Sequence, residues 1–282
     1  MSRPESSIDD RIAPNGDKWT SVVADWVTTS LLNGGVCFFA AYTSNNKPLG
    51  KTLKWLGLAE TTRAFGYIIQ SLAFRSLDDR IVNAISSFTY GSLWGITDIL
   101  CIHYSMLKLS IIDPLLHQKY VNVLFYATYV FIFGTHWAIA IFMIIWYIED
   151  KNLSDDVFKV LKFGAIGVLE WFLICQIMVQ AFKCWTRLDP SRFKRQIRYE
   201  RQFLTMTLAR LLFSSLLYVI LIISYFMDGN FPSVTQAIFI VDQIKRLLPT
   251  ILVLDFLLTK IETMNLDALI ASSPIALSLH DS

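Results

Sequence analysis

The chain has 282 residues, of which 54% are hydrophobic and 17% are charged, and its mean hydropathy is +0.47. Soluble domains carry about 25% charged residues, so this composition excludes an ordinary soluble domain, and the 14% of aromatic residues excludes a disordered chain. The net charge of +2 excludes a polybasic nucleic-acid-binding protein, and only four cysteines exclude a disulfide-stabilised scaffold. The composition is typical of an all-α, polytopic membrane protein.

Seven apolar segments are long enough to cross a bilayer, since a transmembrane helix needs about 20 largely apolar residues. Residues 1–18 are polar and lack the apolar core of a signal peptide, and residues 263–282 are expected to form a short C-terminal tail. We therefore expect residues 19–262 to form a seven-helix bundle, or a bundle of six spans with one interfacial helix. The predicted spans are 19–43, 52–74, 81–107, 120–148, 157–182, 203–227 and 233–259.

The distribution of lysine and arginine predicts the orientation, because cytoplasmic loops are enriched in these residues. The loops after the first, third and fifth spans and the C-terminal tail together hold 12 of them, and the remaining loops and the N-terminal tail hold 6. This distribution predicts an outside or lumenal N-terminus and a cytosolic C-terminus. The acidic loop after the fourth span fits the outer side, and it contains a glycosylation sequon at Asn152 whose use the sequence leaves open.

Ionisable side chains within the spans are functional candidates, because a charge at bilayer depth is costly unless it is paired. Glu60 and Arg63 are three residues apart, so they can pair on one face of the second span. In the seventh span Asp242 precedes Lys245 and Arg246 by three and four residues. This spacing predicts an ion-pair cluster inside the membrane.

Three carboxyls have no basic residue three or four positions away on their own helix: Asp98, Glu170 and Asp255. Burial among apolar groups favours the neutral acid over the carboxylate. Each could therefore donate a proton to a substrate, or a hydrogen bond to a neighbouring helix. Our catalytic candidates are, in order, Asp255, Glu170, Asp98 and Glu60.

Short motifs in four spans resemble those of a known family. They are Gly134-Thr135-His136-Trp137-Ala138 in the fourth span, Trp171 with Cys175-Gln176 in the fifth, Leu208-Ala209-Arg210 in the sixth and Leu254-Asp255 in the seventh. In these motifs and in span order, residues 20–262 resemble the small seven-helix terpene cyclases of fungal meroterpenoid and indole-diterpene biosynthesis. The second span departs from that family's pattern, because Glu60 lacks the family's accompanying Asn and Trp and lies about one helical turn too early.

The resemblance implies a membrane enzyme of secondary metabolism, located in the endoplasmic reticulum, that needs no metal and no cofactor. A neutral carboxylic acid would protonate a prenylated or epoxidised hydrophobic substrate, and the resulting carbocation would cyclise. Aromatic faces stabilise positive charge, so His136, Trp137, Trp171 and Trp94 are the predicted substrate-binding residues. The sequence has no metal-ligand cluster and no glycine-rich phosphate loop.

Two other function classes stay open. Seven spans, an outside N-terminus and a basic fifth loop are also typical of a G-protein-coupled receptor of the plasma membrane, with a cytosolic G protein as its partner. The receptor motifs are missing, since Met106-Leu107-Lys108 stands where Asp-Arg-Tyr would be expected. The third class is a small transporter or channel, whose conduction path the charges of the seventh span could line. The expected partners are the lipid bilayer and a hydrophobic small molecule, and no nucleic acid.

Overall fold

The regular secondary structure of the described residues is helical. The computed structural model describes residues 16–44, 47–75, 80–111, 113–149, 156–186, 194–227 and 232–271, and these residues contain no strand. The prediction of an all-α fold is therefore confirmed for the described part of the chain. The helices are α2 (Gly16–Thr43), α3 (Lys47–Arg75), α4 (Arg80–Ser110), the 3-10 turn η1 (Pro114–His117), α5 (Lys119–Glu149), α6 (Asp156–Thr186), α7 (Lys194–Met227), α8 (Pro232–Arg246) and α9 (Leu248–Ala271).

Three of these helices are long and apolar enough to cross a membrane. They contain the segments Lys119–Phe142 in α5, Val157–Lys183 in α6 and Gln202–Phe226 in α7. Only 33% to 39% of the most apolar part of each segment is buried inside the protein, so most of its side chains face outward. An outward apolar surface on a helix whose backbone hydrogen bonds are internal suits a lipid environment. These features indicate a membrane protein.

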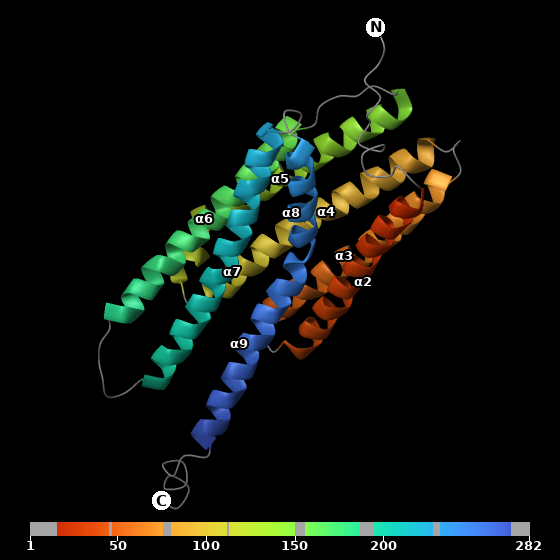
Figure 1. Ribbon diagram of the computed structural model, residues 1–282. Helices are drawn as coiled ribbons and strands as arrows, with labels where there is room; N and C mark the ends of the chain where they lie inside the picture. The colour runs from red at the N-terminus through yellow and green to blue at the C-terminus, as the bar shows by residue number, and fades with distance from the viewer. Residues whose placement is uncertain are drawn as a thin grey trace, which may run out of the picture.

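The helices run side by side along one bundle, and α8 and α9 follow one another along its length (Figure 1). Consecutive helices from α2 to α5 pack against each other, α6 packs against α7, and α9 contacts α2, α4 and α7. One apolar cluster is built largely from α4 to α7 and a second from α2, α3, α4 and α9. Because α4 contributes to both clusters, it lies between them.

The first six predicted spans each coincide with one helix, α2 to α7. The ends differ, since α7 begins at Lys194 and so includes part of the basic fifth loop, and α2 begins within the predicted N-terminal tail. At the C-terminus α9 extends to Ala271, beyond the predicted boundary at 262. Asn152 lies outside the described residues.

The seventh predicted span is wrong as a single helix, because the structure divides it into α8 and α9 at Leu247. Pro249 explains the break, since proline has no N–H to donate and its ring clashes with the carbonyl four residues earlier in a continuous helix. Asn33 of α2 bridges the break. Its Nδ2 donates to the carbonyl of Arg246 (2.8 Å), and its Oδ1 accepts from the hydroxyl of Thr250 (2.5 Å). Asn33 therefore satisfies one of the backbone carbonyls at the break, that of Arg246.

Glycines on α4 bring that helix close to α5. A Cβ at Gly95 would lie 2.9 Å from the ring of His136, whereas a Cβ at Gly91 would meet only the Cβ of Ala140 at 3.6 Å. The absence of a side chain at Gly95 therefore lets the imidazole lie against the α4 backbone. This close approach positions the histidine for the contacts described next.

Candidate functional site

A line of polar residues follows the interior of α4. Trp94, Asp98, Cys101, Ser105 and Lys108 recur at alternating intervals of four and three residues, which places them on one face of the helix. Three of the five, namely the aspartate, the serine and the lysine, are buried. At about 1.5 Å per residue this line is about 21 Å long. We call it the α4 polar face, and each of its ends carries a cluster of charges.

At the first end Asp98 joins α4 to α5 and α8. Its Oδ2 accepts from Nζ of Lys245 at 3.1 Å and lies 3.2 Å from Nε2 of His136. All three side chains are buried. Asp98 is therefore a paired carboxylate, because Lys245 on α8 supplies the cationic partner that its own helix lacks. The expectation that it is a lone acid is wrong.

Both ion pairs expected from local spacing are present, but Lys245 does not belong to the second one. Arg63 Nη2 lies 2.7 Å from Glu60 Oε2, so the pair in α3 is confirmed, and both side chains are fully buried. Arg246 Nη2 lies 3.0 Å from Asp242 Oδ2, which confirms that pair in α8. Lys245 does not complete the predicted cluster, since its ion pair is with Asp98. Successive residues on a helix point about 100° apart, so Lys245 and Arg246 face different neighbours.

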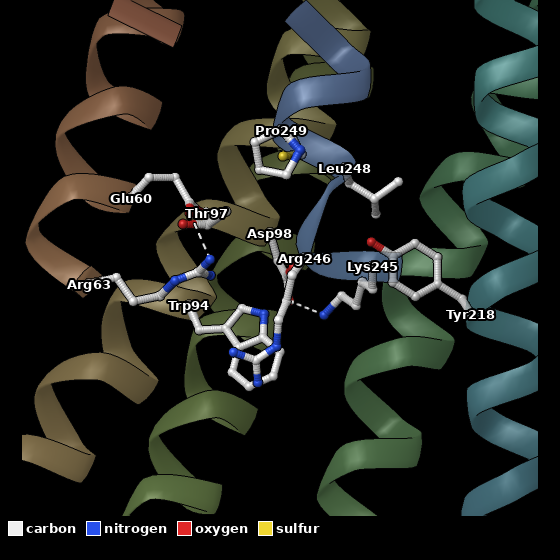
Figure 2. Close-up of a pocket in the computed structure, with 11 residues that line it drawn as sticks. Glu60, Arg63, Trp94, Thr97, Asp98, Tyr218, Lys245, Arg246, Leu248 and Pro249 are labelled. Atoms are coloured by element: carbon white, nitrogen blue, oxygen red, sulfur yellow. Dashed lines mark hydrogen bonds and ion pairs between the residues drawn. The ribbon is translucent and has the colours of Figure 1, made fainter. Parts of the chain in front are cut away.

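The indole of Trp94 is surrounded by four cations from three helices. Its ring centroid lies 6.0 Å from the guanidinium of Arg63, 5.2 Å from Nζ of Lys162, 4.9 Å from Nζ of Lys245 and 5.0 Å from the guanidinium of Arg246. Figure 2 shows Trp94 among the side chains that α3 and α8 contribute, next to the break before α9. We call these five residues, with the carboxyls of Glu60, Asp98 and Asp242, the Trp94 cluster.

A small cavity of about 10 Å³ lies at this cluster, enough for about one water molecule. Its lining combines charged side chains from α3, α4 and α8 with Leu248 and Pro249 of α9 (Figure 2). The lining residues are Glu60, Arg63, Trp94, Thr97, Asp98, Cys101, Tyr218, Lys245, Arg246, Leu248 and Pro249.

At the second end of the α4 polar face, Asp255 of α9 pairs with two cations. Its Oδ1 lies 2.7 Å from Nζ of Lys108, and its Oδ2 accepts from Nε of Arg210 at 3.1 Å. Arg210 also donates through Nη1 to the hydroxyl of Ser105 (3.1 Å). All the ion-paired side chains are at most 8% exposed. We call these four residues the Asp255 cluster. They correct the expectation that Asp255 is a lone acid.

Glu170 is the candidate acid with the least charged surroundings. The hydroxyls of Ser214 and Ser215 on α7 donate to its two carboxyl oxygens, at 2.7 and 3.0 Å. Within the described part of the chain no cation forms an ion pair with it. Of the three carboxyls expected to be lone acids, Glu170 alone keeps that description.

Two of the predicted substrate-binding aromatics lie on the outer surface of the bundle. Trp137 is 44% exposed and Trp171 is 52% exposed. The reason is helical geometry, because each directly follows an inward-facing residue, His136 or Glu170, and adjacent residues on a helix do not share a face. His136 and Trp94 are the predicted aromatics that reach the interior.

Sequence analysis missed two buried cations, Lys162 and Lys108. Both carried a recognisable signal. Lys162 lies eight residues before Glu170 on α6, so the two share one helix face, and Lys108 continues the spacing of four and three residues along α4. The described residues contain no group of three or more His, Cys, Asp or Glu side chains that could hold a metal ion.

Comparisons with protein-family models, with curated proteins and with solved structures find no match for this chain. The geometry of the two clusters and of the helix break is therefore what indicates the function of this chain.

Proposed function

We propose that this chain is a small membrane transporter whose solute pathway follows the α4 polar face between the Trp94 cluster and the Asp255 cluster. The observation that carries this proposal is the break between α8 and α9. Discontinuous transmembrane helices with charged groups at the break form the substrate and ion sites of many secondary transporters. Here the break is flanked by Lys245, Arg246 and Pro249, all of which line the cavity.

The energetics of the buried ion pairs support a functional reason for keeping them. Replacing a buried ion pair by well-packed apolar residues is often neutral or stabilising by about 1–4 kcal/mol. Stability alone therefore does not explain why one bundle buries Asp98 with Lys245 and Asp255 with Lys108 and Arg210. Ionisable groups inside membrane proteins commonly mark ion and substrate pathways.

The two clusters suit the role of gates. At one end Asp98 ties α4 to α8, and at the other Asp255 of α9 ties α4 to α7. Opening either ion pair would release one half of the broken helix while the other half stays attached. The cavity at the Trp94 cluster has room for only about one water molecule, which is consistent with both gates being shut.

The proposal includes seven spans, with α8 and α9 together forming the seventh, an outside or lumenal N-terminus and residence in the endoplasmic reticulum rather than the plasma membrane. Single cysteines introduced at Ser154 and Ser191, both outside the described residues, test the orientation. In sealed membranes an impermeant reagent applied only to the outside or lumenal face should label position 154 and not position 191. The reverse pattern would overturn the orientation.

The native cysteines test the pathway. Cys101 lines the cavity on the α4 polar face, Cys37 is fully buried in the packing of α2 against its neighbours, and Cys175 is exposed on the outer surface of α6. Each is kept as the single cysteine of a variant, and membranes are treated with a charged methanethiosulfonate that dissolves in water and not in lipid. We expect Cys101 to react and the other two to stay unmodified, by mass spectrometry.

The same experiment can refute the proposal. If Cys101 is as unreactive as Cys37 over an hour, no aqueous solute reaches the α4 polar face and the chain does not transport along it. Reaction of Cys175 alone would place water on the outer surface of α6, and the membrane arrangement would be wrong.

A second candidate function is the terpene-cyclase-like enzyme, and Glu170 favours it. This buried carboxyl is held by two serine hydroxyls without a cation, so it can carry the proton that an acid-initiated cyclisation requires. The cavity at the Trp94 cluster is too small for a prenyl chain. Expression with a panel of epoxidised prenyl substrates should yield cyclised product that disappears in Glu170→Gln. Absence of product from the unmodified protein would exclude this function.

A further inference from the structure

We infer that the Trp94 cluster binds a small monovalent anion, a halide, in the cavity that Trp94 and Lys245 line next to the break of the seventh span. The inference names the substrate class of the proposed transporter and in that sense rests on it. Binding can nevertheless be measured without transport, so the two proposals can fail separately.

The charges of the cluster do not balance. Its carboxyls each pair with one cation: Glu60 with Arg63, Asp98 with Lys245, and Asp242 with Arg246. These three pairs leave out Lys162. No carboxylate among the described residues forms an ion pair with its ammonium, and the side chain is only 4% exposed. The cluster therefore holds four cations against three carboxylates, an excess of one positive charge.

The ammonium group of Lys162 contacts two aromatic rings. Its Nζ lies 5.2 Å from the Trp94 ring centroid and 4.2 Å from that of Phe163. The Nζ of Lys245 contacts the same two rings, at 4.9 and 4.7 Å. Two ammonium groups that share two rings repel one another, and cation–π contact compensates only a part of the desolvation of a buried charge. Lys245 and Trp94 line the cavity and Lys162 does not, so an anion in the cavity would supply the missing negative charge to the cluster as a whole.

Thr97 provides an independent sign of a ligand. Its hydroxyl lines the cavity, is buried, and has no hydrogen-bond partner among the described residues. Other hydroxyls on α4 donate to the carbonyl four residues earlier, as Ser92 and Ser105 do. The Thr97 hydroxyl makes no such bond, so it is free to donate to an anion in the cavity.

The size and charge of the site select the ligand. A cavity with room for about one water molecule admits a halide or a group of similar size and excludes a nucleotide or a lipid headgroup. One uncompensated positive charge matches a monovalent anion. Two carboxylates, Glu60 and Asp98, also line the cavity, but Arg63 lies 2.7 Å from the first and Lys245 lies 3.1 Å from the second, so both charges are offset.

The test is a thermal titration of the full-length chain, purified in detergent. Sodium gluconate is replaced stepwise by sodium chloride or bromide at constant ionic strength, and the unfolding midpoint is recorded. We expect a saturable rise of several degrees with at least one of the two halides. If the midpoint of the wild-type protein does not change with either of them, this result by itself overturns the inference, whatever the variants show.

Variants locate the site. Lys162→Met should abolish the anion dependence, and its midpoint without small anions should equal or exceed that of the wild type, because an unpaired buried charge has been removed. Lys162→Arg keeps the charge and should keep the dependence. Thr97→Val should raise the half-saturating concentration several-fold. The matched control is Lys159→Met, one helical turn earlier on α6, which should titrate like the wild type.

The outcomes separate the two proposals. An unchanged titration in Lys162→Met would refute the anion site. A titration that depends on Lys162, together with an unreactive Cys101, would support the anion site and refute the solute pathway. A reactive Cys101 with a flat titration would leave the pathway standing for a solute other than a small anion.

Discussion

Asp255→Asn should destabilise the protein far more than Glu170→Gln, although each replaces a buried carboxyl by the amide of the same shape. Asp255 compensates two buried cations, Lys108 at 2.7 Å and Arg210 at 3.1 Å, and the amide removes this negative charge from both. Removing one partner of a buried ion pair costs about 3–5 kcal/mol. Because two cations lose the same negative charge, we expect the loss to reach the upper end of this range.

Glu170→Gln strands no charge. The glutamine keeps a carbonyl oxygen that can accept from Ser214 or Ser215, so the loss is about one hydrogen bond to a charged or polar group, about 1–3 kcal/mol. The difference between the two variants is therefore about 2 kcal/mol or more, a factor of about 30 in the folding equilibrium. From the sequence alone, both variants would be expected to fold normally.

The measurement is the midpoint of heat-induced loss of the monodisperse peak in size-exclusion chromatography of a fluorescent fusion. We expect the order wild type, Glu170→Gln, Asp255→Asn. Asp255→Asn combined with Lys108→Met and Arg210→Met should recover part of the loss, because no charge remains uncompensated. Equal midpoints for the two single variants, or a triple variant less stable than Asp255→Asn, would show that Asp255 does not form these buried ion pairs.

Further substitutions test the packing and the helix break by the same measurement. Gly95→Ala should cost about 1–3 kcal/mol because its Cβ would lie 2.9 Å from an imidazole ring, whereas Gly91→Ala should be tolerated; equal effects would show that α4 and α5 are not this close. Asp242→Asn should be milder than Asp255→Asn, because Asp242 is 18% exposed and Arg246 keeps a hydrogen bond to a tyrosine hydroxyl; a loss as large as that of Asp255→Asn would contradict this. Asn33→Ala should cost about 1–3 kcal/mol, since it leaves the carbonyl at the break without a partner; an unchanged midpoint would show that water or another group replaces it.

The sequence by itself determined what depends on neighbours along the chain. The positions of the first six helices follow from runs of apolar residues bounded by charges and turns. The pairs Glu60–Arg63 and Asp242–Arg246 follow from a helix that repeats every 3.6 residues, because residues three or four apart share a face. These interactions form in any helix with this sequence, so no knowledge of the bundle is needed to predict them.

Only the tertiary structure decided how distant residues meet. The partner of Asp98 is Lys245, 147 residues away, and no local spacing rule reaches that far. The seventh span contained a proline and a group of charges, but whether a proline kinks a helix or divides it depends on what can satisfy the freed backbone. Here that group is Asn33 on α2. The inward or outward direction of Trp94, Trp137 and Trp171 was likewise set by the way the helices pack, because an aromatic side chain suits a lipid-facing surface and a protein interior equally well.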